Sequence, residues 1–357
     1  MRRWQIIERI GPEWDAWVSR CSNADVYHLS GYLAAMASDP TALPRLLVLE
    51  CDWGLAIHPL LFRPLAALNP LWAGLYDVTS CYGYGGPAWA CWPDAEQALL
   101  REFWAAEAEL LRSLGVVCEF VRLHPLLPAQ EASVEPSARI FRGQTVAIDL
   151  TRPQEELWTA MDSNHRRNIA KAHRLGVQAR HSSHPTDIDA FIDLYTLSMD
   201  RLEARRDYYF PRSCFADLFR LPSGSAWLAT AWLEGQAVAG LLNLAGPSFF
   251  HYHLGGSADR ARDAGVNHFL LFRSFLWARE MGKTQMHLGG GYGAQDDGLL
   301  RFKKGFGGRL CRYSTVQRVL LPAQYAQICR HMGIEPGAGA FFPAYRDPAL
   351  ASVGGAR

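Results

Sequence analysis

A stretch rich in glycine and charge reads Met286-His-Leu-Gly-Gly-Gly-Tyr-Gly-Ala-Gln-Asp-Asp-Gly-Leu-Leu-Arg-Phe-Lys-Lys-Gly-Phe-Gly-Gly-Arg309. Its glycine cluster lets backbone approach another group closely, because glycine has no Cβ. Two adjacent acids precede three cations, which are Arg301, Lys303 and Lys304. A loop of this composition between two hydrophobic elements often carries chemistry. A solvated hairpin with charged side chains is the alternative, and the coincidence of all these features favours chemistry.

Length and composition predict two domains with substantial cores. The 357 residues exceed one average domain, and 49% hydrophobic residues with 12 Trp exclude wholesale disorder. A formal net charge of +1 argues against a protein that coats DNA or a membrane surface, so any basic function is local. We find no apolar run as long as a membrane span and no signal-peptide pattern. We therefore expect a cytoplasmic protein without a transmembrane segment.

The cysteines and histidines do not predict a metal site. The eight cysteines are scattered without a CxxC pair, which is typical of reduced cytosolic thiols. His251 and His253 would point to one face of a strand, but no third ligand follows at usable spacing. Two half-buried polar strand residues are the favoured interpretation.

Periodicity and turn residues predict alternating strands and helices in both halves, an α/β (α+β) fold. In the first half we expect helices at 12–20, 29–37 and 94–114, and strands at 45–50, 54–62 and 116–123. After a connector at 125–137, we expect strands at 144–150, 226–233, 237–244, 248–254, 285–288 and 312–320. The helices of this half are expected at 153–161, 164–175, 187–203, 211–221 and 267–281, the last one buried and capped by Asn267. The domains would span 1–143 and 144–320.

A basic segment suggests an anionic partner. Residues 163–186 contain no acid, and Arg167, Lys171 and Arg174 form one stripe along the predicted helix. Repulsion along such a stripe disfavours the helix unless a phosphate chain or an RNA end binds it. A solvated helix face is the alternative.

Two further groups could bind anions. Arg201 and Arg205 lie one helical turn apart and are followed by Tyr208 and Tyr209, which suits a diphosphate or carboxylate. A surface cluster of ion pairs is an equally good interpretation. The basic loop before Asn267 could bind an anion at a helix N-terminus. No P-loop or GxGxxG fingerprint supports nucleotide hydrolysis or dinucleotide chemistry.

Several stretches together resemble one family. They are Tyr82-Gly-Tyr-Gly-Gly-Pro87, Asn164-His-Arg-Arg-Asn-Ile-Ala-Lys-Ala172, Met199-Asp-Arg201 with Tyr208-Tyr-Phe210, His251-Tyr-His-Leu-Gly-Gly-Ser257, and His287-Leu-Gly-Gly-Gly291 through Phe302-Lys303 to Phe306-Gly307. In this order the chain resembles the FemAB-like branch of the GNAT acyltransferase superfamily. The resemblance implies two tandem GNAT-like domains, each with a mixed, mostly antiparallel sheet flanked by helices. Residues 321–357 would return to the first domain.

The resemblance also implies an activity, the transfer of an acyl or aminoacyl group onto an amine to form an amide. The acceptor would be a cell-envelope precursor or a related small metabolite. The donor would be aminoacyl-tRNA or acyl-CoA, a cosubstrate rather than a tightly bound cofactor, and the tRNA acceptor end is a possible partner. In the family, the lysine of the Phe-Lys pair is thought to stabilise the transition state and contact the tRNA end. That role would fall on Lys303 beside Phe302, with Asp297 a candidate for relaying a proton.

The residues expected to bind substrate are Tyr82, Tyr84, Arg167, Lys171, Arg201, Arg205, Tyr209, His253, Asn267, His287 and Gly290. Two departures from the family leave the identity of the donor open. The sequence has no long coiled-coil insertion, and residues 262–267 match only in part the loop that binds the pyrophosphate of CoA. The alternative function is a non-catalytic GNAT-like module that binds an RNA end or a phosphorylated ligand.

Overall fold

The computed structural model describes residues 2–182, 184–222, 224–335 and 341–348. The chain divides into two units, and each is built from separate pieces of sequence. Unit 1 comprises Met1–Ser22, Met36–Arg142 and Ser314–Arg357, and unit 2 comprises Asn23–Ala35 and Gly143–Tyr313. The predicted domain boundary between residues 143 and 144 would place residues 23–35 in the first domain. In the structure these residues belong to unit 2.

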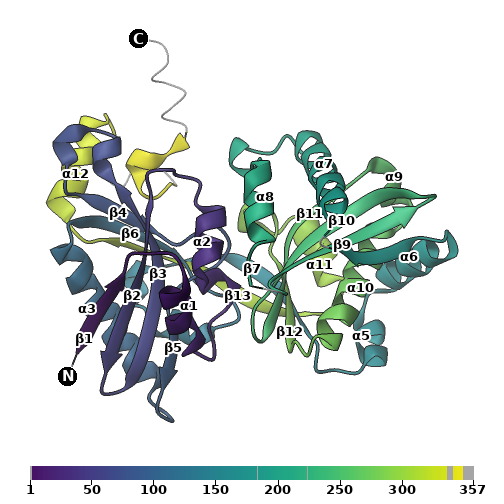
Figure 1. Ribbon diagram of the computed structural model, residues 1–357, viewed down its shortest axis with the longest axis horizontal. Helices are drawn as coiled ribbons and strands as arrows, with labels where there is room; N and C mark the ends of the chain where they lie inside the picture. Colours follow the sequence, from purple (N-terminus) through teal and green to yellow (C-terminus); the bar gives the residue numbers. More distant parts are fainter. Residues whose placement is uncertain (1, 183, 223, 336–340, 349–357) are drawn as a thin grey trace. The chain divides into compact units, whose positions relative to one another are not determined.

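Unit 1 is a mixed sheet flanked by helices (Figure 1). Its strands are β1 (Arg3–Ile7), β2 (Leu43–Cys51), β3 (Gly54–Pro64), β4 (Tyr76–Thr79), β5 (Ala88–Cys91), β6 (Val116–Arg122) and, from Ser314 onward, β13 (Arg309–Val319). Its helices are α1 (Pro12–Ser19), α3 (Glu96–Ser113), α4 (Pro128–Ser133) and α12 (Pro322–His331), with short 3-10 turns at Leu65–Ala67, Pro70–Trp72, Pro136–Ala138 and Ala344–Arg346. The strand order is β1-β2-β3-β4-β6-β13, and β5 pairs with β3.

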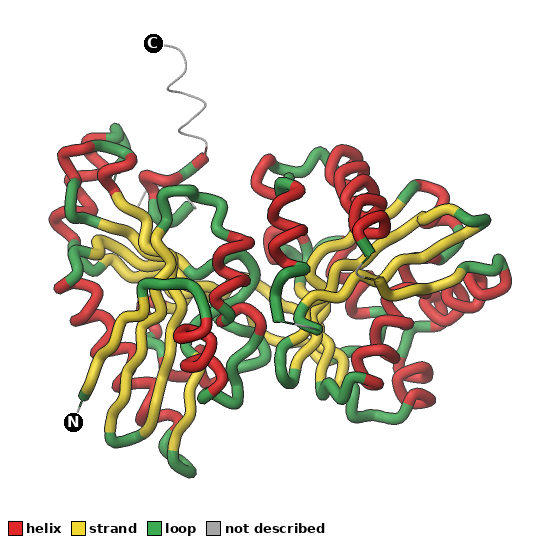
Figure 2. The backbone as a smooth tube through the Cα atoms, viewed as in Figure 1, coloured by secondary structure: helices red, strands yellow, loops and turns green. Residues whose placement is uncertain are grey.

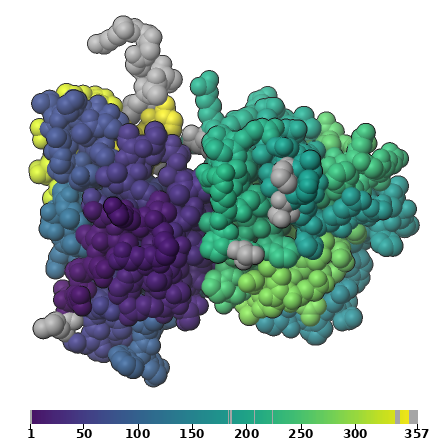
Figure 3. Space-filling model, in the orientation of Figure 1, coloured from purple at the N-terminus to yellow at the C-terminus, as the bar shows by residue number. Residues whose placement is uncertain are grey.

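The C-terminal part of the chain completes the core of unit 1. Helix α12 packs against β6, and its Tyr325 and Ile328 lie in one cluster with Trp72, Cys118 and Tyr345. In Figure 3 the yellow-green atoms of this part lie beside the blue atoms of unit 1. Residues far apart in the sequence thus share one core.

Unit 2 has the same kind of mixed sheet (Figure 2). Its strands are β7 (Arg139–Asp149), β8 (Gln178–Ser182), β9 (Ala226–Leu233), β10 (Gln236–Ala245), β11 (Phe249–Ser257) and β12 (Gln285–Gly289), in the order β7-β12-β11-β10-β9-β8. Its helices are α2 (Ser30–Met36), α5 (Gln154–Ala160), α6 (Ser163–Arg174), α7 (Pro185–Arg201), α8 (Arg212–Leu218), α9 (Asp259–Asp263), α10 (Val266–Glu280) and α11 (Gly298–Lys304). Short 3-10 turns lie at Val26–His28, Arg206–Tyr208 and Tyr292–Ala294.

Most neighbouring strands in both units are antiparallel, and each sheet has one parallel pair. The parallel pair is β4 with β6 in unit 1 and β11 with β12 in unit 2. A helix connects the two strands in each case, α3 in unit 1 and α10 in unit 2, as parallel pairing requires. The predicted α/β (α+β) fold class, with mixed and mostly antiparallel strands in each unit, is confirmed.

The core of unit 2 lies between the sheet and α10. This helix buries residues on nearly every side, among them Phe269, Leu270 and Phe275, because α6 covers the side that faces away from the sheet. Helix α7 packs against β10 and β11, where Gly240 allows the ring of Phe191 to approach. The predicted buried helix is therefore present.

Three details differ from the expectations. Residues 125–137 are not a bare connector, because α4 forms within them. The stretch 286–309 is not one loop, because it contains the end of β12 and helix α11. Asn267 does not cap α10; Gly265 does, with the positive φ of 72° that glycine tolerates best. Among the described residues, no helix combines the length and apolar character needed to cross a membrane.

Candidate active site

The parallel strands β11 and β12 separate part-way along their length. They pair only at Phe249 with Gln285, Phe250 with Met286 and His251 with His287. Beyond these residues β11 continues beside β10 to its end, and β12 turns towards β7 through a bulge. The divergence opens a gap in the ladder between the two strands, in the middle of the sheet of unit 2.

Lys303 lies at this gap. Its side chain is 6% exposed, and its Nζ donates a hydrogen bond of 2.7 Å to the carbonyl oxygen of Gly290, just after β12. The same Nζ lies 5.3 Å from the ring centroid of Tyr252 on β11. One amine therefore contacts residues of both diverging strands.

Burial makes Lys303 an unusual lysine. It lowers the pKa of the amine from 10.5 to about 7, while the nearby Asp297 carboxylate partly opposes this shift. A buried ammonium loses its hydration, so the charged form is disfavoured. Both the charged and the neutral amine are therefore present near pH 7, and the group can bind or release a proton during a reaction.

Asp297 acts on the backbone. It is the N-cap of α11: its carboxylate accepts 2.9 Å from the N–H of Leu300 and 2.8 Å from the N–H of Tyr292. Although partial burial would raise the pKa of this carboxyl, the backbone N–H groups lower it on balance. The structure thus places Asp297 where it orders the helix that carries Lys303.

The glycines before α11 serve close packing within the protein. A Cβ on Gly291 would lie 2.1 Å from the carbonyl oxygen of Gln295 and 2.4 Å from Asp297 Oδ1. A Cβ on Gly290 would lie 2.8 Å from the carbonyl oxygen of Gln144. A larger residue at either position would displace the carbonyl to which Lys303 is bonded or the cap of its helix.

Phe302 belongs to an aromatic cluster beneath α11. Its ring lies 4.9 Å from that of His268 and 5.3 Å from that of Phe306. His165 on α6 lies 5.5 Å from the same ring, and its Nε2 is 2.8 Å from the carbonyl oxygen of Phe302. Tyr252, His165 and His268 were missed by sequence reasoning, although the first two lie inside motifs that carried the family resemblance.

The predicted strand histidines lie deep in unit 2. His287 on β12 is buried, and its ring lies 5.6 Å from that of His251 on β11. His251 Nε2 is 2.5 Å from Asp25 Oδ2, so residues from the 23–35 piece reach this part of the sheet. Burial, followed by the effect of His251, lowers the pKa of His253 to about 3, so His253 is neutral.

Arg201 and Asn267 meet at the end of β11. Arg201 Nη1 donates to the carbonyl oxygen of Ser257 at 3.1 Å and to Asp259 Oδ1 at 2.7 Å. Asn267 Nδ2 donates to Ser257 Oγ at 3.3 Å. These two predicted binding residues are therefore neighbours, but both are hydrogen-bonded within the unit.

Arg205 and Tyr209 follow α7 along the chain. Arg205 is exposed at the start of the short turn Arg206–Tyr208. Tyr209 is 40% exposed, and its hydroxyl donates 2.9 Å to Asp200 Oδ1. This bond engages Asp200, one of the acids of the alternative surface cluster, but it is a hydrogen bond and not an ion pair.

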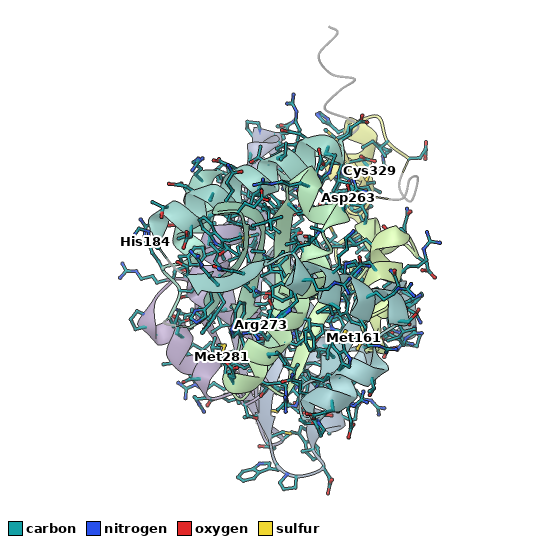
Figure 4. All side chains as sticks on the ribbon, turned by 90° about the vertical axis from the view of Figure 1, so that its right-hand side faces the viewer. Met161, His184, Asp263, Arg273, Met281 and Cys329 are labelled. Carbon is teal, nitrogen blue, oxygen red and sulfur yellow. The ribbon has the colours of Figure 1, made fainter. Side chains whose placement is uncertain are left out.

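Arg167 and Lys171 are exposed on α6, while Ile169 and Ala172 face the core. Together with Arg174 they form the α6 stripe, and none of the three side chains forms an ion pair or hydrogen bond with a described residue. A cavity of about 400 Å³ lies near the end of this helix and is lined by His173, Gln178, Ala179, Arg180, Phe269 and Arg273. Figure 4 labels Arg273, one of the residues that line this cavity.

Tyr82 and Tyr84 belong to unit 1, in the segment between β4 and β5. Both are half-buried, and the ring of Tyr84 lies 6.0 Å from that of His124. Of the predicted residues, the structure of unit 2 thus gathers Lys303, Phe302, Asp297 and Gly290 around α11.

Comparison with known proteins agrees with this architecture. Residues 160–304, which include α6, the diverging strands and Lys303, match the model of the acetyltransferase (GNAT) domain family. The crystal structure of FemX matches with a TM-score of 0.70 at 16% identity, over 91% of this chain and 99% of FemX. Residues 160–304 thus form a GNAT domain, and the chain has the fold of FemX.

Two other solved structures are similar to this chain. A protein of unknown function from Bacteroides thetaiotaomicron has a TM-score of 0.54 at 13% identity, over 88% of this chain and 100% of that protein. The C-terminal domain of a putative lysylphosphatidylglycerol synthetase from Agrobacterium fabrum has a TM-score of 0.51 at 14% identity, over 88% of this chain and 96% of that domain. None of the curated proteins matches the sequence.

Proposed function

We propose that this chain transfers an acyl or aminoacyl group to an amine and so forms an amide. One observation carries the proposal: the amine of Lys303 is buried at the gap between β11 and β12, bonded to Gly290 beyond one strand and beside Tyr252 on the other. A buried basic group in a break of a sheet is costly to maintain. Its position is explained if a reacting carbonyl group enters this gap.

The chemistry is favoured by a cation at such a place. When an amine attacks an ester or thioester carbonyl, a C–N bond forms and the carbonyl oxygen becomes an oxyanion. The C–O or C–S bond then breaks, the leaving oxygen or sulfur takes a proton, and the attacking nitrogen loses one. A fixed cation next to the oxyanion is worth about 3–4 kcal/mol. Protonated Lys303 is the residue of α11 that we assign to this task.

The donor would be aminoacyl-tRNA or acyl-CoA, and the acceptor an amine on a cell-envelope precursor or a related small metabolite. Two features support a phosphate-bearing substrate: the α6 stripe, whose side chains form no ion pair with a described residue, and the arginine-lined cavity beside α6. Arg201 would have to exchange the exposed carboxylate of Asp259 for a substrate anion. No tightly bound cofactor takes part in this reaction.

The test is a transfer assay with labelled donors. The purified chain is incubated with labelled aminoacyl-tRNA or labelled acyl-CoA and a panel of amines, and amide products are counted by mass spectrometry. We expect Lys303→Ala to lower turnover at least about a hundredfold. Lys304→Ala is the matched control, because Lys304 is the next residue but lies closer to solvent and pairs with Asp296 at 3.3 Å. Equal turnover of the two variants would remove Lys303 from the mechanism.

A second candidate function is a GNAT-like module that binds an RNA end or a phosphorylated ligand without catalysis. The exposed α6 stripe favours it, because its three cations form no ion pair within the described part of the chain. Replacing Arg167, Lys171 and Arg174 with Gln should then weaken RNA binding and flatten its dependence on salt, because fewer counterions are released. RNA binding by this measure, with no amide formed from either donor, would favour this function over transfer.

A further inference from the structure

Helix α11 is so short that its two ends decide where Lys303 lies. It has seven residues, fewer than a helix needs for stability on its own. The Asp297 carboxylate caps its first turn through Leu300. Lys303 is in the last turn, so the C-terminal end of the helix is the one that matters most for the amine.

The last turn of α11 is completed by a side chain from another helix. Three of its carbonyls accept hydrogen bonds of 2.9–3.2 Å from the backbone N–H groups that follow, those of Gly305, Phe306 and Gly307. The carbonyl of Phe302 is bonded instead to Nε2 of His165, at 2.8 Å. Carbonyls at helix ends need such partners when they are buried.

The hydrogen on His165 can be assigned from this contact. A carbonyl oxygen only accepts, so Nε2 must carry a hydrogen, and in the neutral ring Nδ1 is then the bare nitrogen. His165 is 5% exposed, and its Nδ1 has no partner among the described residues. Protonation of Nδ1 would create a buried donor without an acceptor, so His165 stays neutral and donates in one fixed direction.

The chain is built to admit this histidine. A Cβ on Gly305 would lie 2.2 Å from His165 Cε1 and 2.6 Å from its Nε2. Only glycine at this position lets the ring reach the end of α11. His268 flanks the same ring at 4.6 Å but has no hydrogen bond to a described residue of α11.

We propose that His165 is a positioning residue for Lys303: by donating its Nε2 hydrogen to the Phe302 carbonyl, it completes the last turn of α11 and holds the amine at the gap between β11 and β12. This inference rests on the proposed function, because it assigns a purpose to the position of Lys303. It goes beyond that function because it gives α6 a second role. The helix that carries the α6 stripe also supports α11, on which Lys303 lies.

The experiment compares two substitutions of nearly the same shape. His165→Gln keeps an N–H that can reach the Phe302 carbonyl, whereas His165→Met fills the same space without a donor. His268→Met is the control, because His268 belongs to the same aromatic cluster without bonding to α11. Thermal unfolding of each variant shows that the fold is retained.

The first measurement needs no substrate. Lysine occurs at only four positions, Lys171, Lys283, Lys303 and Lys304, so lysine labelled with ¹³C at Cε gives few NMR signals. Each signal is assigned by a Lys→Arg substitution and followed against pH. In His165→Met we expect the midpoint of the Lys303 titration to move up towards the ordinary 10.5, because a loosened α11 admits water to the amine. His165→Gln and His268→Met should keep the midpoint of the unmodified chain.

The second measurement is the transfer assay. A displacement of a reacting group by about 1 Å can cost about a hundredfold in rate, so we expect kcat of His165→Met to fall at least about tenfold with KM little changed. His165→Gln should recover most of this loss. An unchanged Lys303 titration in His165→Met, or a His165→Gln variant as impaired as His165→Met, would overturn the inference. If the unmodified chain transfers nothing, the proposed function fails while the titration still decides the role of His165.

Discussion

The two units have the same central arrangement and use it in opposite ways. In each, a helix connects two parallel strands in the middle of a mixed sheet. In unit 2 the strands β11 and β12 diverge and a basic amine lies at the gap. In unit 1 the chain that follows β4 stays on β6: the N–H of Ser80 donates to the carbonyl of Phe120 at 3.0 Å, and Gly85 bridges to Leu123. The parallel pair in unit 1 is therefore closed, and the parallel pair in unit 2 is open.

A neutral amide closes the pair in unit 1. Buried Gln130 donates from Nε2 to the carbonyls of Gly85 at 3.1 Å and Pro87 at 2.8 Å. Its Oε1 accepts from the N–H of His124 at 2.7 Å. Gly86 lacks a Cβ, which would otherwise lie 2.6 Å from Gln130 Oε1. The Gln130 amide thus forms these three hydrogen bonds with backbone groups of unit 1, and such bonds stabilise the sheet.

Buried charge follows the same contrast. In unit 1, Arg318 binds Glu107 at 2.7 Å and Glu119 at 2.5 Å, so its charge is neutralised by two carboxylates. In unit 2, Lys303 is bonded to a neutral carbonyl, and Asp297 uses its carboxylate to cap a helix. The comparison teaches that a buried charge left without a direct ion pair is the better indicator of function.

The strongest test of this contrast is the stability of Lys303→Met. The fall in the pKa of Lys303 from 10.5 to about 7 means that charging the buried amine costs about 4–5 kcal/mol. The lost bond to Gly290 subtracts about 1 kcal/mol. We therefore expect the variant to be inactive but more stable than the original chain by about 3 kcal/mol below pH 7. Urea unfolding measures this difference.

The pH dependence of that gain has a definite sign. Between pH 7 and 10.5 the unfolded lysine holds a proton that the folded one has lost, so the stability of the original chain rises with pH. The advantage of Lys303→Met should shrink over this range and be gone above pH 10.5. Lys304→Met, the control, should show neither effect. A Lys303→Met chain less stable at every pH would make Lys303 a structural residue like Arg318.

A substitution at the closed pair of unit 1 should lower the stability of the chain, whereas Lys303→Met should raise it. Gln130→Met removes three hydrogen bonds and leaves two carbonyls and one N–H buried. We expect a loss of about 3 kcal/mol in the free energy of unfolding, measured by urea denaturation. A change below about 0.5 kcal/mol would mean that water replaces the amide and that unit 1 is not closed by Gln130.

Turnover should depend on pH through the same lysine. If the ammonium form of Lys303 stabilises the oxyanion, kcat falls as pH rises through about 7, by about tenfold at pH 8 relative to the acid limit. In Lys303→Arg the charge persists, so the alkaline fall should disappear whatever rate remains. A rate that rises through pH 7 would instead assign Lys303 as the proton acceptor for the attacking amine.

The smallest expected effect is that of the helix cap. Asp297→Ala removes the acceptor for Leu300 and Tyr292 and should cost about 1 kcal/mol of stability. Because the Asp297 carboxylate also favours the charged amine, the midpoint of the Lys303 titration should fall further below its present value. An unchanged midpoint in the NMR titration would show that Asp297 and Lys303 are not electrostatically linked.

Local signals in the sequence predicted much of the fold. The β9–β10 hairpin follows from Glu234-Gly235, which adopt φ of 53° and 76° as a tight turn requires. The apolar faces of α10 predicted a buried helix. Strand β8 could not be predicted, because Gln178-Ala-Arg-His-Ser182 has no apolar alternation and pairs only through its neighbour β9. The insertion of residues 23–35 into unit 2 brings Asp25 into contact with His251, which lies 226 positions away in the sequence.

The sequence named candidate residues for the site, but it did not predict their burial or their hydrogen bonds. The sequence proposed Phe302, Lys303 and Gly290 as site residues, and in the structure Lys303 is hydrogen-bonded to Gly290. Spacing could not reveal that Lys303 is buried, that Asp297 caps its helix or that His165 reaches it from α6. These facts depend on which backbone groups lack partners at the end of a short helix, and that is decided only when distant segments pack.

The division of the chain into interleaved pieces has a consequence for its synthesis. Residues 23–35 leave the ribosome long before the rest of unit 2, and the end of β13 and all of α12, which complete unit 1, come after it. Unit 2 can therefore be finished first, while the first-made strands of unit 1 wait for their last partners. Neither unit corresponds to one contiguous fragment of the gene. Truncation at residue 143 would leave unit 1 without α12 and take residues 23–35 away from unit 2.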